Sequence, residues 1–455
     1  MYDLIIQGGS YPDFRRKQML QGDIAVKNGR IAAIGAIREP AKQVIQAQGR
    51  VVSPGFLDIH MHEEDFSKEG ECFQIAERML KMGVTTCVGG NCGTQHQSVA
   101  QFRTVLDRLG GAPVNYLLQA GYNTARQALG LTHYETASPE QIKTLIAQMQ
   151  QELDSGAIGI SFGLEYDPGI STEEVLQVVQ ALHHPDLFVS MHYREDSVGA
   201  EASIREMIAI AEAIAPNRFQ ISHLSSCSAM GQMAPSLALI NEAMARLPGL
   251  DYDTYPYSAF STGIGTAVFD DGCFEHWGKD YSSILLTDGP HKGEFCTKEL
   301  FEQVRREDPE QYVVAMVMNE DEIAAALTNP TGMVASDGII SNGHGHPRAA
   351  GTFPRVLGKY VREEGKLSLL EALRKMTLAP ADRLRLFHKG RIEVGCDADL
   401  TVFDPTTIQD GATFTDLDVP VTGIDLVVVN GHIALERGSM ICGRAGRFLT
   451  LPERT

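Results

Sequence analysis

Positive charge is scarce in this sequence of 455 residues, which has 39 lysines and arginines against 58 aspartates and glutamates and a formal net charge of −19. The basic residues form no cluster that would reverse this sign locally. A surface of net negative charge repels polyanions, so we expect neither nucleic acid nor an anionic membrane as a partner.

Long apolar runs are also missing. No uncharged apolar stretch reaches the roughly 18 residues of a membrane-spanning helix, and the N-terminal MYDLIIQGG lacks basic residues followed by an apolar core. We therefore expect a cytoplasmic protein. The cysteines are too few and too scattered for a disulfide scaffold, so most of them should be free, buried thiols. They are Cys72, Cys87, Cys92, Cys227, Cys273, Cys296, Cys396 and Cys442.

Both ends of the chain have the pattern of short strands and tight turns. Asn28-Gly29 and Asn430-Gly431 each lie between alternating apolar residues, and Asn-Gly is a preferred sequence of the type I′ hairpin turn. An isolated hairpin is only marginally stable in water. We therefore expect residues 1–52 and 391–455 to form one small β-sandwich domain together.

The intervening residues 53–390 alternate eight apolar, strand-like runs with amphipathic, helix-like stretches. Ser171 and Glu174 have the spacing of a capping box at the start of one such stretch. This pattern favours an α/β fold, a (β/α)8 TIM barrel, because parallel strands covered on both faces are almost continuously apolar. The interval from about 258 to 332 is longer than a connection needs and contains the single tryptophan, Trp277, so we expect a lid there.

Metal-binding side chains follow the ends of five of the predicted strands. His60 and His62 lie in PGFLDIHMHEE, where alternation along a strand places both on one face and Met61 on the other. The carboxyl ends of barrel strands converge on one active site. Imidazole, thiolate and carboxylate together suit zinc. The candidate ligands are His60, His62, Cys92, His192, His223 and Asp337.

These motifs resemble a known family. The His-x-His after PGFLD, the order of the candidate ligands, the SDG at 336–338 and the terminal GRIEVGCDADLTVFD are similar to the amidohydrolase superfamily over nearly the whole chain. More narrowly, GNCG, ISFGLEYDPG, MHYRED, QISH and HPRAAGTFPRVL resemble the D-aminoacylase, or N-acyl-D-amino-acid deacylase, branch. The resemblance implies a zinc enzyme that hydrolyses N-acyl-D-amino acids, or closely related amides, to a carboxylate and a free D-amino acid.

The resemblance also implies how the ligands divide. One tightly bound Zn²⁺ would be held by Cys92, His192 and His223, and a weaker second site would use His60, His62 and Asp337 and share Cys92. A carboxylate beside zinc can take the proton of the attacking water and pass it to the leaving amine. We assign this general acid/base role to Asp337.

Further residues are candidates for contacts with the substrate. In the resembling deacylases the arginine of the HPR motif, here Arg348, binds the substrate's α-carboxylate, which a planar guanidinium fits with two parallel hydrogen bonds. Tyr255 and Tyr257 of TYPY are candidate hydroxyl donors. Ser225 is another candidate contact, and His344, with His346 in the same motif, is a candidate to face the substrate or to support the ligands.

Three positions depart from the pattern of that branch or leave it open. After His223 the chain reads LSS, where the branch usually continues with a histidine and a lysine that helps to hold the substrate. Tyr122 or Asn123 stands where the branch commonly has a histidine. Glu165 follows the fourth predicted strand and is a candidate metal ligand, a partner of a ligating histidine, or a structural residue.

Two other classes of function remain open. One is a cyclic amidohydrolase of the dihydroorotase or hydantoinase kind, which usually carries a carboxylated lysine on strand four, where this chain offers Glu165. The other is a non-catalytic assembly protein, against which the intact ligand set argues. The expected partner is a small-molecule amide. The sequence leaves open the acyl group, the side chain accepted, the number of metals and the oligomeric state, a homo-oligomer included.

Overall fold

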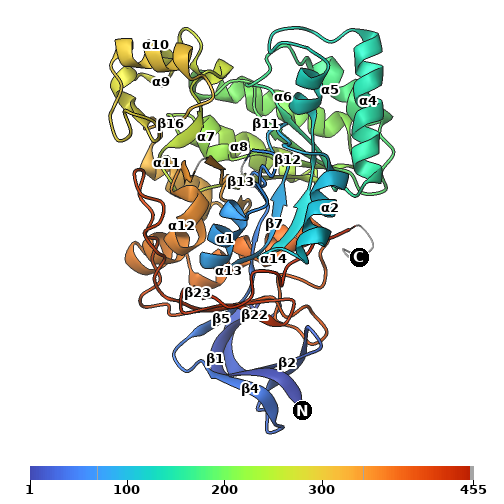
Figure 1. Cartoon of the computed structure of the whole chain (residues 1–455), viewed down its shortest axis with the longest axis vertical. Helices are drawn as coiled ribbons and strands as arrows, with labels where there is room; N and C mark the ends of the chain where they lie inside the picture. The colour runs from blue at the N-terminus through green and yellow to red at the C-terminus, as the bar shows by residue number, and fades with distance from the viewer. Residues whose placement is uncertain (69, 342, 451–455) are drawn as a thin grey trace.

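The computed structural model describes residues 1–68, 70–341 and 343–450. Strands from both ends of the chain form a single nine-stranded sheet at one end of the molecule (Figure 1). Its order is β23-β22-β21-β20-β5-β1-β2-β3, with β4 paired to β1. The strands are β1 (Tyr2–Asp13), β2 (Gln18–Lys27), β3 (Arg30–Gly35), β4 (Ala41–Gln46), β5 (Val51–Pro54), β20 (Leu400–Phe403), β21 (Ile424–Val429), β22 (His432–Glu436) and β23 (Ser439–Met440).

The two predicted hairpins of this sheet are confirmed. β2 pairs with β3, and β21 pairs with β22, both antiparallel. Asn28 and Gly29 have φ values of 51° and 76°, and Asn430 and Gly431 have 49° and 80°. Positive φ at both central residues is what a type I′ turn requires. β5 and β20 pair antiparallel and join the two ends of the chain.

The middle of the chain supplies parallel strands that hydrogen-bond to one another in chain order. They form two runs, β6-β7-β8 and β9-β10-β11-β12-β13-β17. Only Gln119 separates β8 from β9, and its N–H donates to Gly89 O at 3.0 Å. The strands are β6 (Phe56–Asp58), β7 (Val84–Gly89), β8 (Asn115–Leu118), β9 (Ala120–Gly121), β10 (Gly159–Gly163), β11 (Phe188–His192), β12 (Arg218–Ile221), β13 (Leu250–Thr254) and β17 (Met333–Val334).

The first and last of these strands meet just beyond their carboxyl ends. Met61 and Gly338 form a parallel bridge. Asp337 N–H donates to His60 O at 2.8 Å, and His62 N–H donates to Gly338 O at 2.9 Å. These contacts fix the backbone of Asp337 against the segment that carries both histidines, just beyond β6.

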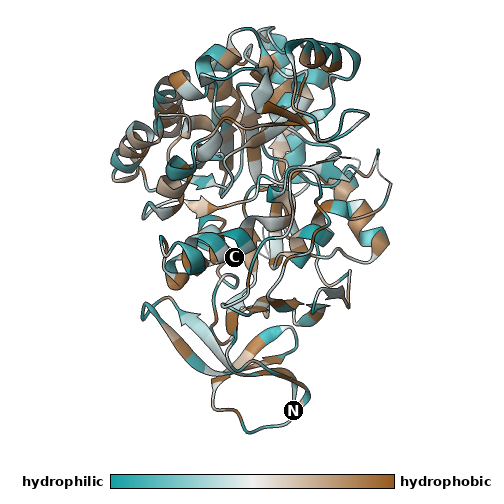
Figure 2. Ribbon diagram, turned by 90° about the vertical axis from the view of Figure 1, so that its left-hand side faces the viewer, coloured by the Kyte–Doolittle hydropathy of each residue, from teal (hydrophilic) through white to brown (hydrophobic). Residues whose placement is uncertain are grey.

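Helices follow most of the parallel strands and bury one face each, and the ribbon in Figure 2 accordingly alternates hydrophilic and hydrophobic stretches. Ser171 accepts a hydrogen bond from Glu174 N, but the Glu174 side chain binds Arg126, so only half of the predicted capping box forms. The helices are α1 (Gln74–Lys81), α2 (Val99–Leu109), α3 (Tyr122–Ala128), α4 (Pro139–Asp154), α5 (Thr172–Ala181), η1 (Ser197–Gly199), α6 (Ala200–Ala213), α7 (Leu224–Ser228), α8 (Met233–Met244), α11 (Glu320–Thr328), α12 (Arg348–Arg355), η4 (Val356–Glu363), α13 (Leu369–Met376) and α14 (Leu378–Arg383). Among the helices of the described ranges, none combines the length and the apolar character of a membrane span.

The segment in which we expected a lid forms a small subdomain opposite the terminal sheet (Figure 1). Its three strands pair antiparallel in the order β14-β16-β15. Trp277 Nε1 donates to Asp196 Oδ2 at 2.8 Å, which fastens the subdomain to the loop after β11. The elements are β14 (Phe260–Gly263), η2 (Ala267–Phe269), α9 (Cys273–Trp277), η3 (Tyr281–Ser283), β15 (Ile284–Leu286), α10 (Lys298–Glu307) and β16 (Tyr312–Ala315).

The expected lid boundary at about residue 332 is too late. Helix α11 packs against α7, α8 and β13, so residues 320–328 belong to the helical layer around the parallel strands. After β17, a short hairpin of β18 (Ile340–Ser341) and β19 (His344–Gly345) leads into α12.

Candidate metal centre and substrate pocket

The six candidate metal ligands come together at the carboxyl ends of the parallel strands. Their donor atoms form two groups, and within each group the atoms lie within 4.8 Å of one another. All six side chains are buried. The first group is His60, His62, Cys92 and Asp337, and the second is Cys92, His192 and His223.

Cys92 stands at the junction of the two groups. Its Sγ lies 3.3 Å from His60 Nε2 and 3.3 Å from His223 Nε2. Asp337 Oδ1 lies 3.3 Å from His62 Nε2 and 3.4 Å from His60 Nε2. A single thiolate can therefore serve both groups of donors.

The backbone at three of these residues is strained. Cys92, His223 and Asp337 have φ values of 53°, 33° and 49°, in the left-handed region that side-chain-bearing residues seldom adopt. Strain of this kind costs on the order of 1–3 kcal/mol per residue and clusters at functional sites. Here it turns each side chain back toward the shared centre just after its strand ends.

The charges of the cluster favour the ionised forms of its thiol and its carboxyl group. Burial opposes ionisation of Cys92, but the neighbouring His60 and His223 outweigh it and hold the pKa of the thiol well below its usual value. Asp337 is buried too, and the Arg348 guanidinium nevertheless holds the pKa of its carboxyl well below the ordinary value. Thiolate and carboxylate are the ligand forms of Cys and Asp.

The donor set fits zinc. Imidazole nitrogens, a thiolate and a carboxylate are the usual zinc ligands. His192 Nε2 contacts Glu165, whereas its Nδ1 is buried and has no hydrogen-bond partner among the described residues. Buried polar atoms normally have a partner, so this orphaned nitrogen indicates room for an ion at the cluster.

Residues that the sequence did not single out hold the ligating histidines in place. Asp253 Oδ1 lies 3.2 Å from His60 Nδ1 and accepts a hydrogen bond from His223 N at 2.8 Å. Ser226 Oγ lies 2.8 Å from His223 Nδ1 and accepts a hydrogen bond from Tyr193 OH at 3.0 Å. Such outer contacts fix the orientation and tautomer of a metal-binding imidazole.

Ser225, which we expected to contact the substrate, is fully buried, and its Oγ has no hydrogen-bond partner in the structure. The neighbouring Ser226 makes the contact with His223 instead. The sequence indicates this contact only through spacing. Ser226 stands three residues after His223, which is about one turn of a helix, and α7 begins directly after His223.

Glu165 contacts a ligating histidine. Its Oε2 lies 2.8 Å from His192 Nε2, and burial raises the pKa of its carboxyl to about 8. Glu165 was a candidate metal ligand, a partner of a ligating histidine, or a structural residue. The contact with His192 is the one expected of a partner of a ligating histidine.

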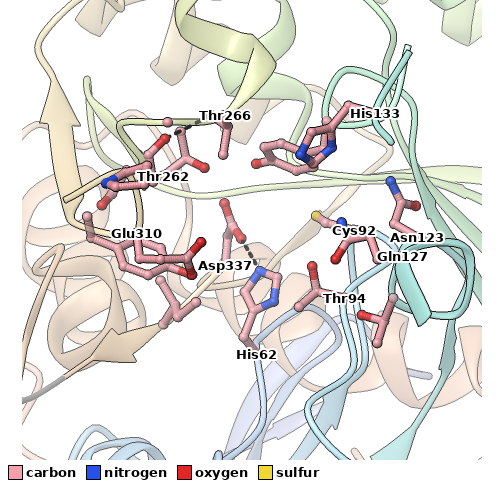
Figure 3. A pocket seen from close by; sticks show the side chains of 18 of the residues that line it. His62, Cys92, Thr94, Asn123, Gln127, His133, Thr262, Thr266, Glu310 and Asp337 are labelled. Carbon is pink, nitrogen blue, oxygen red and sulfur yellow. Dashed lines mark hydrogen bonds and ion pairs between the residues drawn. The ribbon is translucent and has the colours of Figure 1, made fainter. Parts of the chain in front are cut away.

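A pocket of about 390 Å³ opens over the metal-binding cluster (Figure 3). One wall comes from the loop after β7 and from helix α3 and the loop that follows it, and the other comes from the insertion between β13 and α11. Side chains on the first wall include Thr94, Asn123, Gln127 and His133, those on the second include Thr262, Thr266 and Glu310, and His62, Cys92 and Asp337 lie between them (Figure 3). Asn123 faces the pocket, whereas Tyr122 is buried against Glu174 at 2.8 Å.

Arg348 is the first residue of α12 and lines the pocket beside Asp337. Its Nη1 lies 2.9 Å from Asp337 Oδ2, its Nη2 donates to Ser261 O at 3.2 Å, and its guanidinium lies 4.8 Å from the centre of the Tyr255 ring. His346, fully buried, accepts a hydrogen bond from Arg348 N at 3.0 Å. The guanidinium is thus fixed from several sides before any substrate binds.

Three predicted substrate contacts lie elsewhere. Tyr255 stacks under Arg348, and its hydroxyl points to Met318 Sδ at 3.8 Å. Tyr257 OH donates to Asp410 Oδ2 at 3.3 Å. His344 lies in the β18–β19 hairpin, 3.1 Å from Lys292 Nζ. In the described part of the chain, none of the three is among the side chains that line the pocket.

An α/β fold that gathers imidazole, thiolate and carboxylate donors at the carboxyl ends of its parallel strands defines a metal-dependent hydrolase of the amidohydrolase type. Models of the amidohydrolase family match this chain at residues 51–215 and again at 306–435. The chain belongs to the amidohydrolase family, in its D-aminoacylase branch.

Known relatives in this branch span the whole chain. D-aminoacylase of Alcaligenes xylosoxydans xylosoxydans is 30% identical over 98% of this chain and 97% of its own length. A structure of D-aminoacylase that addresses its binuclear metal centre superposes with a TM-score of 0.89 at 29% identity, over 99% of this chain and 100% of that one. N-acyl-D-glutamate deacylase from Bordetella bronchiseptica, solved with zinc and a phosphonate inhibitor, gives a TM-score of 0.88 at 28% identity, over 99% of each chain.

Proposed function

We propose that this protein is a zinc-dependent hydrolase of N-acyl-D-amino acids, which it cleaves to a carboxylate and a free D-amino acid. The observation that carries the proposal is the pocket in which a fixed guanidinium, Arg348, stands beside two groups of metal ligands joined through Cys92. The family membership supports it, because D-aminoacylase and N-acyl-D-glutamate deacylase are full-length relatives. On this proposal the eight parallel strand positions form a (β/α)8 barrel, which the contact between Met61 and Gly338 would close.

Cys92, His192 and His223 would hold one zinc ion tightly, and His60, His62 and Asp337 would offer a second site that shares Cys92. Zinc bound there would supply two kinds of chemistry, since it would lower the pKa of a bound water towards about 7 and would polarise the amide carbonyl. Asp253 and Ser226 keep His60 and His223 oriented for that ion.

Asp337 is the general acid/base of the proposed reaction. Its carboxylate accepts a proton from the attacking water and then donates that proton to the nitrogen of the leaving amine, which departs as the free amino acid. Arg348 keeps the Asp337 carboxylate ionised and available for this role. The same guanidinium binds the α-carboxylate of the substrate and so sets the scissile amide over the ligands.

The second candidate from the sequence, hydrolysis of cyclic amides, has less support. Position 165 carries a glutamate in contact with His192, where a carboxylated lysine would be expected for that class. The cytoplasmic location and the oligomeric state stay predictions.

A metal and substrate analysis tests the proposal. We expect at least one zinc per chain in the purified protein, and hydrolysis of N-acyl-D-amino acids in preference to their L-isomers and to cyclic amides. Cys92→Ala should lose metal and activity together, because it removes the donor that both sites share. Cys87→Ala is a matched control, since Cys87 is also buried but belongs to neither ligand group. Full zinc content and full activity of Cys92→Ala would contradict the assignment.

A further inference from the structure

The pocket is lined by more acidic side chains than lysines or arginines. Among the described residues that line it, Arg348 is the single lysine or arginine, and on the proposed function its guanidinium is engaged by the substrate's α-carboxylate. Glu310 is the remaining acidic lining residue apart from Asp337, and its side chain is exposed at the mouth of the pocket. None of the ion pairs found within residues 1–68, 70–341 and 343–450 involves Glu310. Besides the ion pair of Arg348 with Asp337, the described pocket lining therefore has one acidic side chain in no ion pair, Glu310, and no second lysine or arginine.

Glu310 lies on the same wall as the group that fixes Arg348. Ser261 O, which accepts from Arg348 Nη2, belongs to β14, and β14 pairs with β16, with Gly263 opposite Tyr312. Gly265 N donates to Pro309 O at 2.9 Å and ties the loop that carries Glu310 to the end of β14. The residue that fixes Arg348 and the loop that carries Glu310 are thus joined to the same small sheet.

This arrangement orients the substrate. On the proposed function the α-carboxylate would bind Arg348, and the scissile amide would lie at His62, Cys92 and Asp337, which stand between the two walls in Figure 3. With the α-carboxylate at Arg348 and the amide at the metal ligands, the side chain on the same carbon atom would extend along the insertion wall that carries Glu310. The acyl group then faces the opposite wall, where Thr94, Gln127 and His133 are neutral or, in the case of His133, paired at 2.5 Å with Asp167.

We propose that Glu310 determines which substrate side chains are accepted, so that the enzyme favours N-acyl-D-amino acids with basic side chains over those with acidic ones. This inference rests on the proposed function and specifies which substrate side chains the reaction accepts. A second carboxylate on the substrate would find no second lysine or arginine among the described lining residues and would be repelled by Glu310. Rejection of one charge by a like charge is a common route to specificity.

The size of the effect follows from the exposure of Glu310. Two unit charges about 6 Å apart in a water-like dielectric change an equilibrium by about threefold. Attraction of a basic side chain and repulsion of an acidic one act in opposite directions. We therefore expect kcat/KM for N-acetyl-D-lysine to exceed that for N-acetyl-D-glutamate by about 10-fold through this residue alone, and the ratio to shrink as salt screens the charges.

The test compares N-acetyl-D-lysine, N-acetyl-D-methionine and N-acetyl-D-glutamate on the zinc-loaded wild-type enzyme and on Glu310→Gln and Glu310→Lys. The lysine-to-glutamate ratio of kcat/KM should fall about 10-fold in Glu310→Gln and fall further in Glu310→Lys. Glu307→Gln is the control, because Glu307 is exposed on the same insertion but does not line the pocket, and it should keep the wild-type ratio.

Turnover of the uncharged methionine derivative by the wild-type enzyme reports on the proposed function separately. Equilibrium binding of the products D-lysine and D-glutamate to the same variants reports on charge preference without any turnover. A wild-type ratio retained by Glu310→Lys in both measurements would overturn the role of Glu310, whether or not the methionine derivative is hydrolysed.

Discussion

Replacing Arg348 separates recognition of the substrate from support of the general acid/base. The guanidinium is 2% exposed and lies 2.9 Å from Asp337 Oδ2, yet its Nε and Nη1 make no hydrogen bond in the structure. The contact with Asp337 is thus an ion pair that leaves donors for a second carboxylate. A hydrogen bond to a charged group contributes about 1.5–3 kcal/mol. Loss of the contact to the α-carboxylate in Arg348→Met, which keeps the length of the side chain, should therefore lower kcat/KM by roughly 10²-fold.

The assay measures kcat/KM for one N-acetyl-D-amino acid and for its α-amide, which lacks the carboxylate. If Arg348 binds the carboxylate, wild-type enzyme should strongly prefer the acid, and Arg348→Met should lose most of that preference. Arg348→Lys, which keeps a charge but not the planar pair of donors, should be intermediate. Equal losses on acid and amide would refute the reasoning and show that Arg348 acts only by keeping Asp337 ionised.

Three further outcomes are expected. Asp337→Asn should retain zinc bound by the other ligand group, while kcat falls roughly 10²-fold or more for lack of a proton acceptor, and a variant within a few fold of wild type would exclude Asp337 from the mechanism. Ser226→Ala should weaken zinc binding about 10-fold in a chelator competition, because it frees His223 Nδ1, whereas Ser225→Ala should bind zinc as wild type does. Glu174→Gln should destabilise the fold by about 3 kcal/mol in chemical denaturation, since it removes the nearer charged partner of the buried guanidinium of Arg126 and leaves only Asp167 at 4.0 Å, and an unchanged midpoint would show that the pair is dispensable.

The ligands could be predicted from the sequence because a strand has a simple rule for direction. Alternation along the apolar run predicted that His60 and His62 share a face, and the parallel order of the strands brought residues far apart in sequence to one end. Tyr255 and Tyr257 were proposed as substrate contacts from their position after the seventh predicted strand. Position along the chain alone does not fix where a side chain points once the strand has ended, and β13 ends at Thr254.

The supporting residues were harder to foresee for a different reason. Asp253 acts on His60 and His223, which lie on other strands, and nothing local to its own segment marks that contact. Glu310 reaches the pocket only because β16 pairs with β14 across the intervening α9 and α10. Contacts of this kind depend on which distant segments of the chain pair with each other, and the local pattern of a single sequence does not reveal that pairing.

The shared sheet of the two chain ends has a consequence for synthesis on the ribosome. Apolar side chains of β1 and β2, such as Leu4, Ile6 and Ile24, pack in one cluster with Leu400 and Leu426. Likewise, β5 gains its antiparallel partner, β20, only after residues 400–403 have been synthesised. A nascent chain must therefore carry its earliest strands with an uncovered apolar face until almost the entire polypeptide has been made. That interval is when an exposed strand is most open to aggregation and to capture by a chaperone.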